Sequence, residues 1–332
     1  MSMSSTVSDA APRSDAAALP AKQPFLWSVK REFWEHGSIY IAPLAITGLM
    51  LFGFVISLFS LTRHNAEIKA NMTPDSMQAI MILPYDIAAM SVIIGSVVVG
   101  LFYCLSALYS ERRERSILFW KSLPVSNLTT VLSKAFMPMV ALPLIVAAIV
   151  IATHIVMLLL NIVARSMAGL SVSELVGNVP LFQVDVALAY GVITLALWHA
   201  PIYAWFILVS GWAKKAPILW AAIPPVALAV VERIAFGTNY VGNLIAYRLG
   251  GGIDAAFSEP RYLPMRSLHE HIVKNPAAHP THHVGKNGIP MFGLEQIDIA
   301  GFLSTPGLWA GLIVAAAFLA AAVWMRRTRE AI

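Results

Sequence analysis

The sequence predicts an all-α, polytopic membrane protein with six transmembrane helices. The 332-residue chain is 58% hydrophobic and only 12% charged, which is roughly half the charged share of an average soluble domain. Its mean hydropathy is +0.70, and its apolar residues form blocks long enough to cross roughly 30 Å of hydrocarbon. These observations exclude an ordinary soluble domain, and they make nucleic-acid binding a poor explanation for the net charge of +5.

Each expected span is an apolar block of ~20 residues or more, the length that crosses the hydrocarbon core. The six blocks lie at about 38–61, 87–109, 134–162, 184–212, 216–236 and 304–325. The third and fourth blocks exceed the required length, so we expect their helices to tilt or to project beyond the bilayer. Pro138 and Pro143 lie in the third block, where they are expected to loosen the helix.

The distribution of basic residues predicts that both termini are cytoplasmic. Four alternate segments outside the spans hold fourteen of the 23 basic residues, and cytoplasmic loops carry such an excess. These residues are Arg13, Lys22, Lys30, Arg31, Arg112, Arg113, Arg115, Lys121, Lys134, Lys214, Lys215, Arg326, Arg327 and Arg329. The first and third loops hold only Arg63, Lys69 and Arg165. The fifth connection, residues 237–303, is predicted to be extracytoplasmic, because loops this long translocate largely regardless of charge.

The two ends of the chain are expected to be short cytoplasmic tails. Residues 1–23 are rich in Ala, Ser and Pro and are predicted to be disordered, and residues 326–332 form the second tail. The N-terminal tail lacks the apolar core of a cleavable signal peptide, so we expect the first span to direct insertion. Cys104 is the single cysteine, which excludes an intrachain disulfide.

An amphipathic helix is predicted over residues 24–37, just before the first span. It mixes bulky aromatic residues with charge, a composition typical of helices that lie in the membrane interface. The residues that define it are Phe25, Trp27, Lys30, Arg31, Phe33 and Trp34. A plain aromatic anchor explains these residues equally well.

The loop between the second and third spans is both strongly basic and amphipathic. Residues 112–123 can form about three helical turns, and Pro124 disfavours helix at Leu123. Ser126 or Asn127 can then cap the helix that continues into the third span. From these residues alone, a helix lying on the membrane surface is the simpler interpretation, and docking to a soluble partner is the alternative.

The same loop resembles a known family segment. The run Tyr109 to Ser126, YSERRERSILFWKSLPVS, is similar to the segment that follows the second of six spans in bacterial ABC-2 type permeases. Lys30 to Glu35, KREFWE, resembles the connecting helix that leads into the first span of that family. The resemblance implies an ABC-2, type V exporter-like permease fold with an interfacial connecting helix and a cytoplasmic coupling helix.

The resemblance also implies a function: the transmembrane subunit of an ATP-binding cassette exporter in the bacterial inner membrane. Such permeases dimerise, with a second copy or a sister permease, and bind two separate ATPase subunits through the coupling helix. Carried over here, the coupling residues are Glu111, Arg112, Arg113, Glu114, Arg115, Ser116, Ile117, Leu118, Phe119, Trp120, Lys121, Leu123 and Pro124. The cargo is unidentified; the scarcity of intramembrane charge favours a hydrophobic or amphipathic molecule.

The chain itself is expected to be non-catalytic and to hold no cofactor. It has no G-x-x-x-x-G-K-[S/T] phosphate loop, and Val284 to Gly288 lacks the required glycine spacing and hydroxyl. If ATP drives the process, ATP and Mg²⁺ must therefore bind to the partner ATPase.

Ionisable residues in the spans support a second hypothesis, an ion-coupled secondary transporter or channel that acts without an ATPase. His154 and His199 fall inside predicted spans, where such groups face protein or water rather than lipid. Glu232 and Arg233 lie at the outer end of the fifth span. All four are candidate pathway residues, although a neutral histidine hydrogen-bonded between helices and an interfacial anchor are the simpler interpretations. The paired broken helices of many secondary transporters are not evident.

The fifth connection invites a third hypothesis, a membrane metalloenzyme. It contains His269, Glu270, His271, His279, His282 and His283, and imidazole is a common ligand of zinc and copper. No recognisable catalytic set accompanies these residues, so we expect a cap over the outer mouth of the protein and no metal. Residues 239–253 can form a helix that dips back into the interface.

Overall fold

The computed structural model describes residues 22–69, 74–114, 125–258, 261–264, 288–291 and 293–328, and it is almost entirely helical. Six of its helical stretches are long and apolar enough to cross a membrane, as expected of a multi-pass membrane protein. They lie at Ser38–Phe59, Met81–Arg113, Asn127–Met167, Val172–Trp212, Pro217–Phe236 and Pro306–Thr328.

Helices make up almost all of the described secondary structure. The helices are α1 Lys22–Glu35, α2 Ser38–Lys69, α3 Pro74–Ala107, α4 Tyr109–Arg113, α6 Asn127–Phe136, α7 Leu142–Met167, α8 Val172–Asn178, α9 Leu181–Trp212, α10 Pro217–Phe236, α11 Tyr240–Ala256, α13 Ile299–Ser304 and α14 Pro306–Thr328. A π-helical turn, η1 Met137–Ala141, joins α6 to α7, and a 3₁₀ turn, η2 Leu294–Gln296, precedes α13. Two antiparallel strands, β1 Arg261–Pro264 and β2 Gly288–Met291, depart from the all-α expectation.

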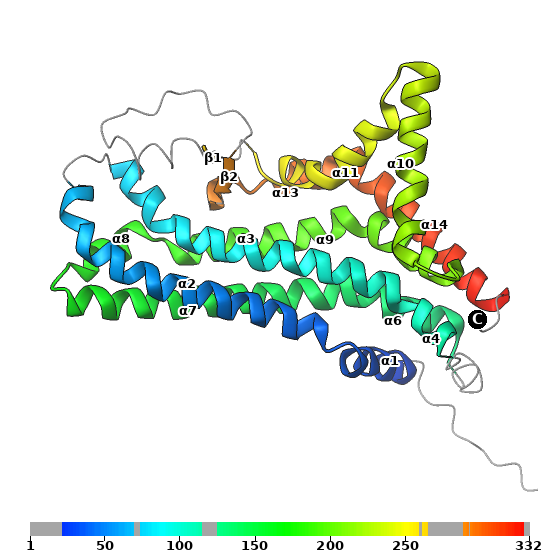
Figure 1. Cartoon of the computed structure of the whole chain (residues 1–332), viewed down its shortest axis with the longest axis horizontal. Helices are drawn as coiled ribbons and strands as arrows, with labels where there is room; N and C mark the ends of the chain where they lie inside the picture. Colours follow the sequence, from blue (N-terminus) through cyan, green and yellow to red (C-terminus); the bar gives the residue numbers. More distant parts are fainter. Residues whose placement is uncertain are drawn as a thin grey trace, which may run out of the picture.

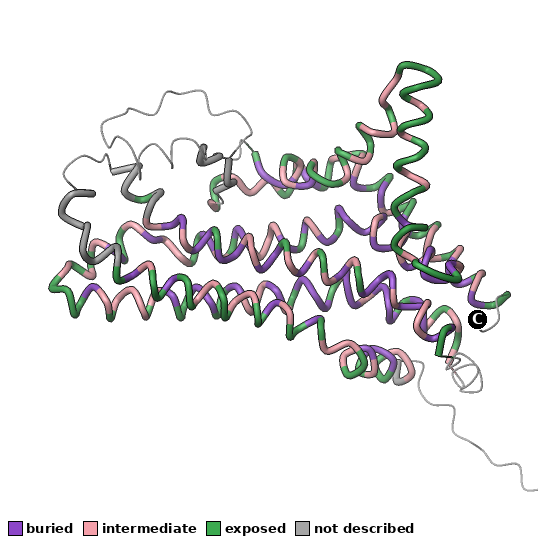
Figure 2. The backbone as a smooth tube through the Cα atoms, viewed as in Figure 1, coloured by how far each residue is buried: buried purple, intermediate pink, exposed green. Residues whose placement is uncertain are grey.

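The long helices form an elongated bundle around α9 (Figure 1). Helix α9 contacts α3, α7, α11 and α14, and α2 packs against α3 and α7. Buried residues follow the facing sides of these helices (Figure 2), and α9 buries the largest number because it has neighbours on most of its circumference. One end of the bundle gathers α1, α4, the start of α6 and the C-terminal end of α14 (Figure 1).

The third span is continuous through its two prolines. Ser126 accepts a hydrogen bond from the Thr129 N–H at 3.0 Å and is the N-cap of α6, which confirms the expected cap. Pro138 lies in the π-helical turn η1, and Pro143 lies in the first turn of α7. A π-helical turn shifts the backbone hydrogen-bond register by one residue, and this is where the helix accommodates Pro138, which has no N–H to donate.

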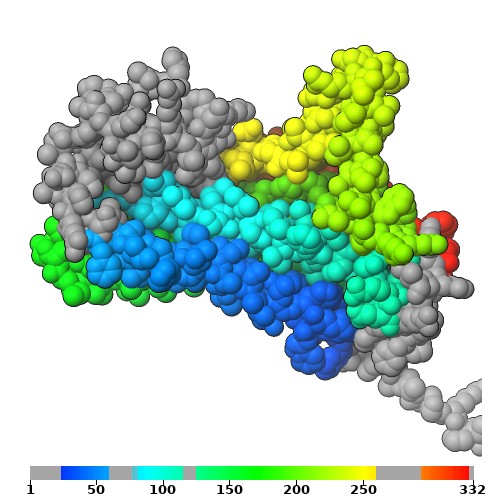
Figure 3. Space-filling view, viewed as in Figure 1, coloured from blue at the N-terminus to red at the C-terminus, as the bar shows by residue number. Residues whose placement is uncertain are grey.

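Helices α10 and α11 form a hairpin that stands away from the bundle (Figures 1 and 3). Within α10, which is described throughout, Ala221 is the one buried residue, while apolar side chains such as Trp220, Ile223 and Phe236 are exposed. Glu232 of α10 accepts hydrogen bonds from Tyr240 N–H at 2.6 Å and Val241 N–H at 2.7 Å. It therefore caps the first turn of α11 and fixes the bend of the hairpin.

The base of α11 packs closely on α9. The Trp198 indole of α9 is buried and donates a hydrogen bond to the Tyr247 carbonyl at 3.3 Å. Its ring lies directly against Gly252, and the guanidinium of Arg248 lies 4.9 Å from the ring centroid. A residue without a side chain is therefore required where α11 crosses Trp198.

Replacing Gly252 with Ala is expected to destabilise the fold, whereas Gly250→Ala is not. A Cβ at Gly252 would lie 2.9 Å from the Trp198 ring, while nothing lies within 4 Å of a Cβ at Gly250. Both changes gain a similar helix propensity of roughly 1 kcal/mol, so their difference isolates the clash, about 1–3 kcal/mol. Thermal unfolding of both variants in mild detergent measures this difference. Equal stabilities would contradict the close packing of α11 on Trp198.

Candidate functional site

A cluster of buried charges lies where α1, α4, α6 and α14 meet. It consists of Arg31 and Glu32 of α1, Glu111 of α4, Lys134 of α6 and Arg326 of α14, and we call it the ion cluster. The side chains of Glu32, Lys134, Arg326 and Glu111 are 0%, 1%, 4% and 6% exposed. Buried charges are costly unless they are paired, so these contacts decide how this end of the bundle assembles.

Glu32 is the most completely paired carboxylate of the ion cluster. Its Oε1 accepts hydrogen bonds from Lys134 Nζ at 2.9 Å and from Arg31 Nη2 at 2.8 Å. Its Oε2 accepts one from the Tyr103 hydroxyl of α3 at 2.7 Å. A carboxylate has lone pairs for about four such bonds, so both oxygens are satisfied away from water.

Glu111 supplies the second carboxylate. Its Oε1 lies 3.2 Å from Lys134 Nζ and 3.2 Å from Arg31 Nη2. Its Oε2 accepts a hydrogen bond from Arg326, whose Nε also donates to Asn127 Oδ1 at 3.1 Å. Lys134 and Arg31 therefore bridge the two carboxylates. The C-terminal end of α14 is tied to the start of residues 111–124, which we call the basic segment.

The sequence of α1 explains how Glu32 reaches this position. Ser28, Val29 and Glu32 lie on one face of the helix and are buried. On the opposite face Trp27 and Trp34 are exposed, and Lys30 Nζ lies about 5 Å from both indole rings. Helical spacing thus separates an aromatic and cationic outer face from an inner face that carries Glu32.

The electrostatics of the ion cluster favour an ionised Glu32. Burial raises the pKa of Glu32, but the Lys134 charge and the hydrogen bonds from Lys134, Arg31 and Tyr103 outweigh burial and lower the pKa to about 2. Burial lowers the pKa of His36, and the Lys134 charge adds to this effect, so His36 is neutral at neutral pH. Glu35, next to the ion cluster, places its Oε1 3.5 Å from Arg31 Nε. The cations of Arg31, Lys134 and Arg326 are therefore matched by three carboxylates, those of Glu32, Glu35 and Glu111.

The basic segment is anchored a second time through Arg112. Its Nη1 donates hydrogen bonds to the carbonyls of Gly211 at 2.6 Å and Ala213 at 3.4 Å, at the C-terminus of α9. A cation is favourable at this end of a helix because the last carbonyls lack intrahelical partners. Arg112 is buried, whereas the side chain of the next residue, Arg113, is 65% exposed.

The sequence-predicted site residues differ in whether they are buried, exposed or outside the described residues. Glu111 and Arg112 are buried inside the chain, and Arg113 and Glu114 are exposed; the expected coupling residues 115–124 lie outside the described residues. Of the connecting helix, Phe25 and Phe33 pack against the core, while Trp27, Lys30 and Trp34 face outward. The histidine-rich stretch that suggested a metal site, residues 269–283, lies outside the described residues.

The candidate pathway residues lie apart from the ion cluster. His154 is buried and contacts Asp185. His199 Nδ1 donates a hydrogen bond to the Leu195 carbonyl of its own helix at 2.9 Å. Glu232 caps α11, and Arg233 is exposed. The structure does not bring these four residues together.

Sequence reasoning missed several buried polar residues. Lys134 and Arg326 belong to the ion cluster and Tyr103 donates to it. Asp185 lies beside His154, and buried Asp86 follows Tyr85, whose carbonyl contacts His154. The available signal was an ionisable residue within or beside an apolar block, which requires a partner at the same depth.

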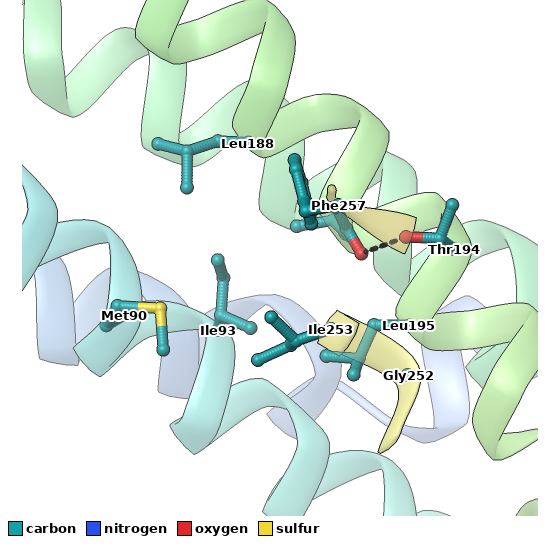
Figure 4. Close-up of a pocket in the computed structure, with 10 residues that line it drawn as sticks. Met90, Ile93, Leu188, Thr194, Leu195, Gly252, Ile253 and Phe257 are labelled. Carbon is teal, nitrogen blue, oxygen red and sulfur yellow. Dashed lines mark hydrogen bonds between the residues drawn. The ribbon is translucent and has the colours of Figure 1, made fainter. Parts of the chain in front are cut away.

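A small, apolar pocket lies within the described bundle (Figure 4). It measures about 40 Å³ and lies between α3, α9 and α11, where Met90, Ile93, Leu188 and Phe257 line it. A drug-sized ligand requires at least ~300 Å³, so this space holds no such molecule. Within the described residues, no group of three His, Cys, Asp or Glu side chains is arranged to bind a metal.

Comparison with protein-family models, curated proteins and solved structures gave no match.

Replacing Lys134 with Met is expected to destabilise the protein by about 3–5 kcal/mol, because it removes the more deeply buried of the two cations that bridge Glu32 and Glu111 and leaves two cations beside three carboxylates, a net negative charge. Lys214→Met is the matched control, since Lys214 is exposed at the same end of the bundle and surface changes stay within about 0.5 kcal/mol. Denaturant unfolding in mild detergent measures both. If Lys134→Met is as stable as Lys214→Met, the ion cluster does not hold this end together.

Stability is expected to fall as the pH drops from about 4.5, the ordinary pKa of a glutamate, toward the folded-state pKa of Glu32, about 2. A carboxyl with a lowered pKa stabilises the fold above its unfolded-state pKa, and this contribution disappears as the group becomes protonated. Glu32→Gln removes the titration, so its stability should decline less steeply over the same range. Unfolding at a series of pH values measures both slopes. Identical slopes would show that Glu32 is not the titrating group.

Proposed function

We propose that this chain is the membrane-spanning permease subunit of an ATP-binding cassette exporter in the bacterial inner membrane. A separate ATPase drives it, and the unidentified substrate is hydrophobic or amphipathic. The observation that carries the proposal is the ion cluster, because it joins the root of the basic segment to the helices of the bundle. Residues 109–126 resemble the coupling segment of ABC-2 permeases. We therefore interpret the start of the basic segment as the point where an ATPase would act on the bundle.

The anchoring of Glu111 and Arg112 supports a mechanical role for the basic segment. Glu111 contacts α1, α6 and α14, and Arg112 contacts the end of α9. A force applied to residues 113–124 by an ATPase would therefore reach four helices through buried, hydrogen-bonded contacts. In this proposal, Arg113 and the residues after it form the surface on which the ATPase docks. Glu111 and Arg112 transmit the force of the ATPase to the helices of the bundle.

The arrangement of basic segments supports cytoplasmic termini. Helix α1, α4, the α9–α10 connection and the C-terminal end of α14 lie at the same end of the bundle (Figure 1). These segments carry Lys30, Arg113, Lys214, Lys215 and Arg327, and such an excess marks the cytoplasmic side. The end that an ATPase would reach is thus the end that carries the ion cluster.

The exposed α10 supports a pathway formed between permease copies or along the lipid. Its exposed apolar side chains require lipid or a partner helix around them, because an extended apolar surface is unfavourable in water. A second copy or a sister permease would supply such a partner helix. The pocket of about 40 Å³ beside α9 is too small for a hydrophobic substrate.

The alternative is an ion-coupled secondary transporter or channel that acts without an ATPase. The contact between buried His154 and Asp185, 2.5 Å apart, favours it, because charged pairs at membrane depth often mark ion pathways. Glu232 and His199 contribute less to this alternative, since both are engaged in local backbone hydrogen bonds.

Affinity purification of the tagged chain from native membranes tests the proposal. We expect an ATPase with a Walker motif to co-purify at about one copy per permease. Arg113→Glu with Arg115→Glu should reduce the recovered ATPase at least tenfold, equivalent to about 1.4 kcal/mol of binding free energy, because both charges belong to the proposed docking surface. Arg112 is left unchanged because it is buried against α9.

Lys214→Glu with Lys215→Glu is the matched control, since it makes the same change in charge at exposed positions on the same end of the bundle. An equal loss of ATPase in both double variants would reject residues 113–124 as the docking surface. If no ATPase co-purifies in several detergents and transport stops with an uncoupler, the exporter assignment fails and the ion-coupled alternative holds.

A further inference from the structure

Three titratable side chains lie on three neighbouring helices far from the ion cluster. They are Asp86 of α3, His154 of α7 and Asp185 of α9, and we call them the carboxyl–histidine cluster. His154 is fully buried and Asp86 is 1% exposed, whereas the Asp185 side chain is 13% exposed. His154 is thirteen residues before the last residue of α7, which is roughly 20 Å along the helix, so the cluster lies well inside the bundle.

Hydrogen bonding fixes the number of protons on the histidine and its partner. His154 Nε2 lies 3.1 Å from the Tyr85 carbonyl, which only accepts, so Nε2 carries a hydrogen. His154 Nδ1 lies 2.5 Å from Asp185 Oδ1, and a contact this short between two acceptor atoms requires one proton between them. Whichever atom carries that proton, the His154–Asp185 pair has no net charge.

Asp86 has no such partner. Both of its carboxyl oxygens are buried and make no hydrogen bond within the part of the chain that the structure describes. It directly follows Tyr85, whose carbonyl accepts the Nε2 hydrogen of His154 at 3.1 Å, so it lies on the same part of α3, but the second ring nitrogen of His154 is engaged with Asp185. An ionised carboxylate in this position would be an uncompensated buried charge, which is strongly unfavourable.

The other groups around the cluster do not supply the missing charge. Tyr85 packs edge-on against His154 and faces Phe54 of α2. Arg165 of α7 pairs with Glu174 of α8 at 3.3 Å and donates to the Ser171 carbonyl. Across the described residues no three His, Cys, Asp or Glu side chains are arranged for a metal ion. A proton on Asp86 is the simplest group that neutralises the cluster.

We propose that the carboxyl–histidine cluster is a proton-binding site, with the exchangeable proton on Asp86. In the closed bundle the Asp86 carboxyl is protonated and neutral. When movement of α3 relative to α7 and α9 admits water, the O–H bond breaks, the proton passes to water, and the carboxylate becomes hydrated. Proton release is thereby linked to the packing of three helices, and this property does not depend on the exporter assignment.

Infrared difference spectroscopy of the purified full chain tests the proposal. In sodium-free choline buffer at neutral pH, the wild type is expected to show the carbonyl band of a protonated carboxylic acid, which disappears as the pH rises. Asp86→Asn should lose this band, and the control Asp254→Asn should keep it, because Asp254 is an exposed carboxylate of α11. Absence of the band in the wild type, or its persistence in Asp86→Asn, would overturn the proposal.

Two further measurements separate the remaining outcomes. Raising sodium at constant pH should leave the band unchanged; if sodium removes it, the site binds a monovalent cation and the proton assignment is wrong. The thermal midpoint of the wild type should fall as the pH rises through the loss of the band, since ionisation is unfavourable in the closed bundle. Asp86→Asn, which is neutral at every pH, should lack this fall, and a parallel fall in both proteins would overturn the proposal.

Discussion

The assembly of one end of this molecule depends on Lys134, a lysine buried between two carboxylates. Its ammonium group lies 2.9 Å from Glu32 and 3.2 Å from Glu111. Two carboxylates that share a dry site repel each other unless a cation lies between them. Arg31 contacts the same two carboxylates from the more exposed side. Because Lys134, Glu32 and Glu111 belong to α6, α1 and α4, the buried lysine ties the interfacial helix and the start of the basic segment to the third span.

A buried ion cluster of this kind supplies geometry more than net stability. The desolvation of paired charges offsets much of their attraction, and apolar replacements of equal volume are often as stable. Each contact of the ion cluster has a fixed direction, however, and Arg326, Tyr103 and Asn127 occupy the remaining hydrogen-bonding positions. We interpret the ion cluster as the feature that specifies how α1, α4 and α14 dock on α6, which apolar surfaces alone would leave free to slide.

Sequence reasoning could predict the features that depend on local composition and could not predict the two clusters. The six apolar helices and the Ser126 cap follow from block length and from the residue type at one position. Lys134 in sequence is one more basic residue beside a span, and its partner Glu32 is 102 residues away. Local amphipathicity cannot distinguish a charge that faces a partner protein from one that faces the chain's own helices, as Arg112 does. Asp86 lies at the edge of an apolar block, where a carboxylate normally indicates the end of a membrane span.

The two clusters differ in how the charge of each carboxyl group is neutralised, by a neighbouring cation or by a proton. In the ion cluster every carboxylate has a cation within 3.5 Å, so no proton is needed for neutrality and the contacts persist over a wide pH range. In the carboxyl–histidine cluster neither oxygen of Asp86 makes a hydrogen bond to any described residue. The clusters nevertheless share helices: Lys134 and His154 belong to one continuous helical stretch, Asn127–Met167, twenty residues or roughly 30 Å apart. A movement of that stretch at the ion cluster would pass through the π-helical turn Met137–Ala141, which would absorb part of it. The part that reaches His154 would change the surroundings of Asp86.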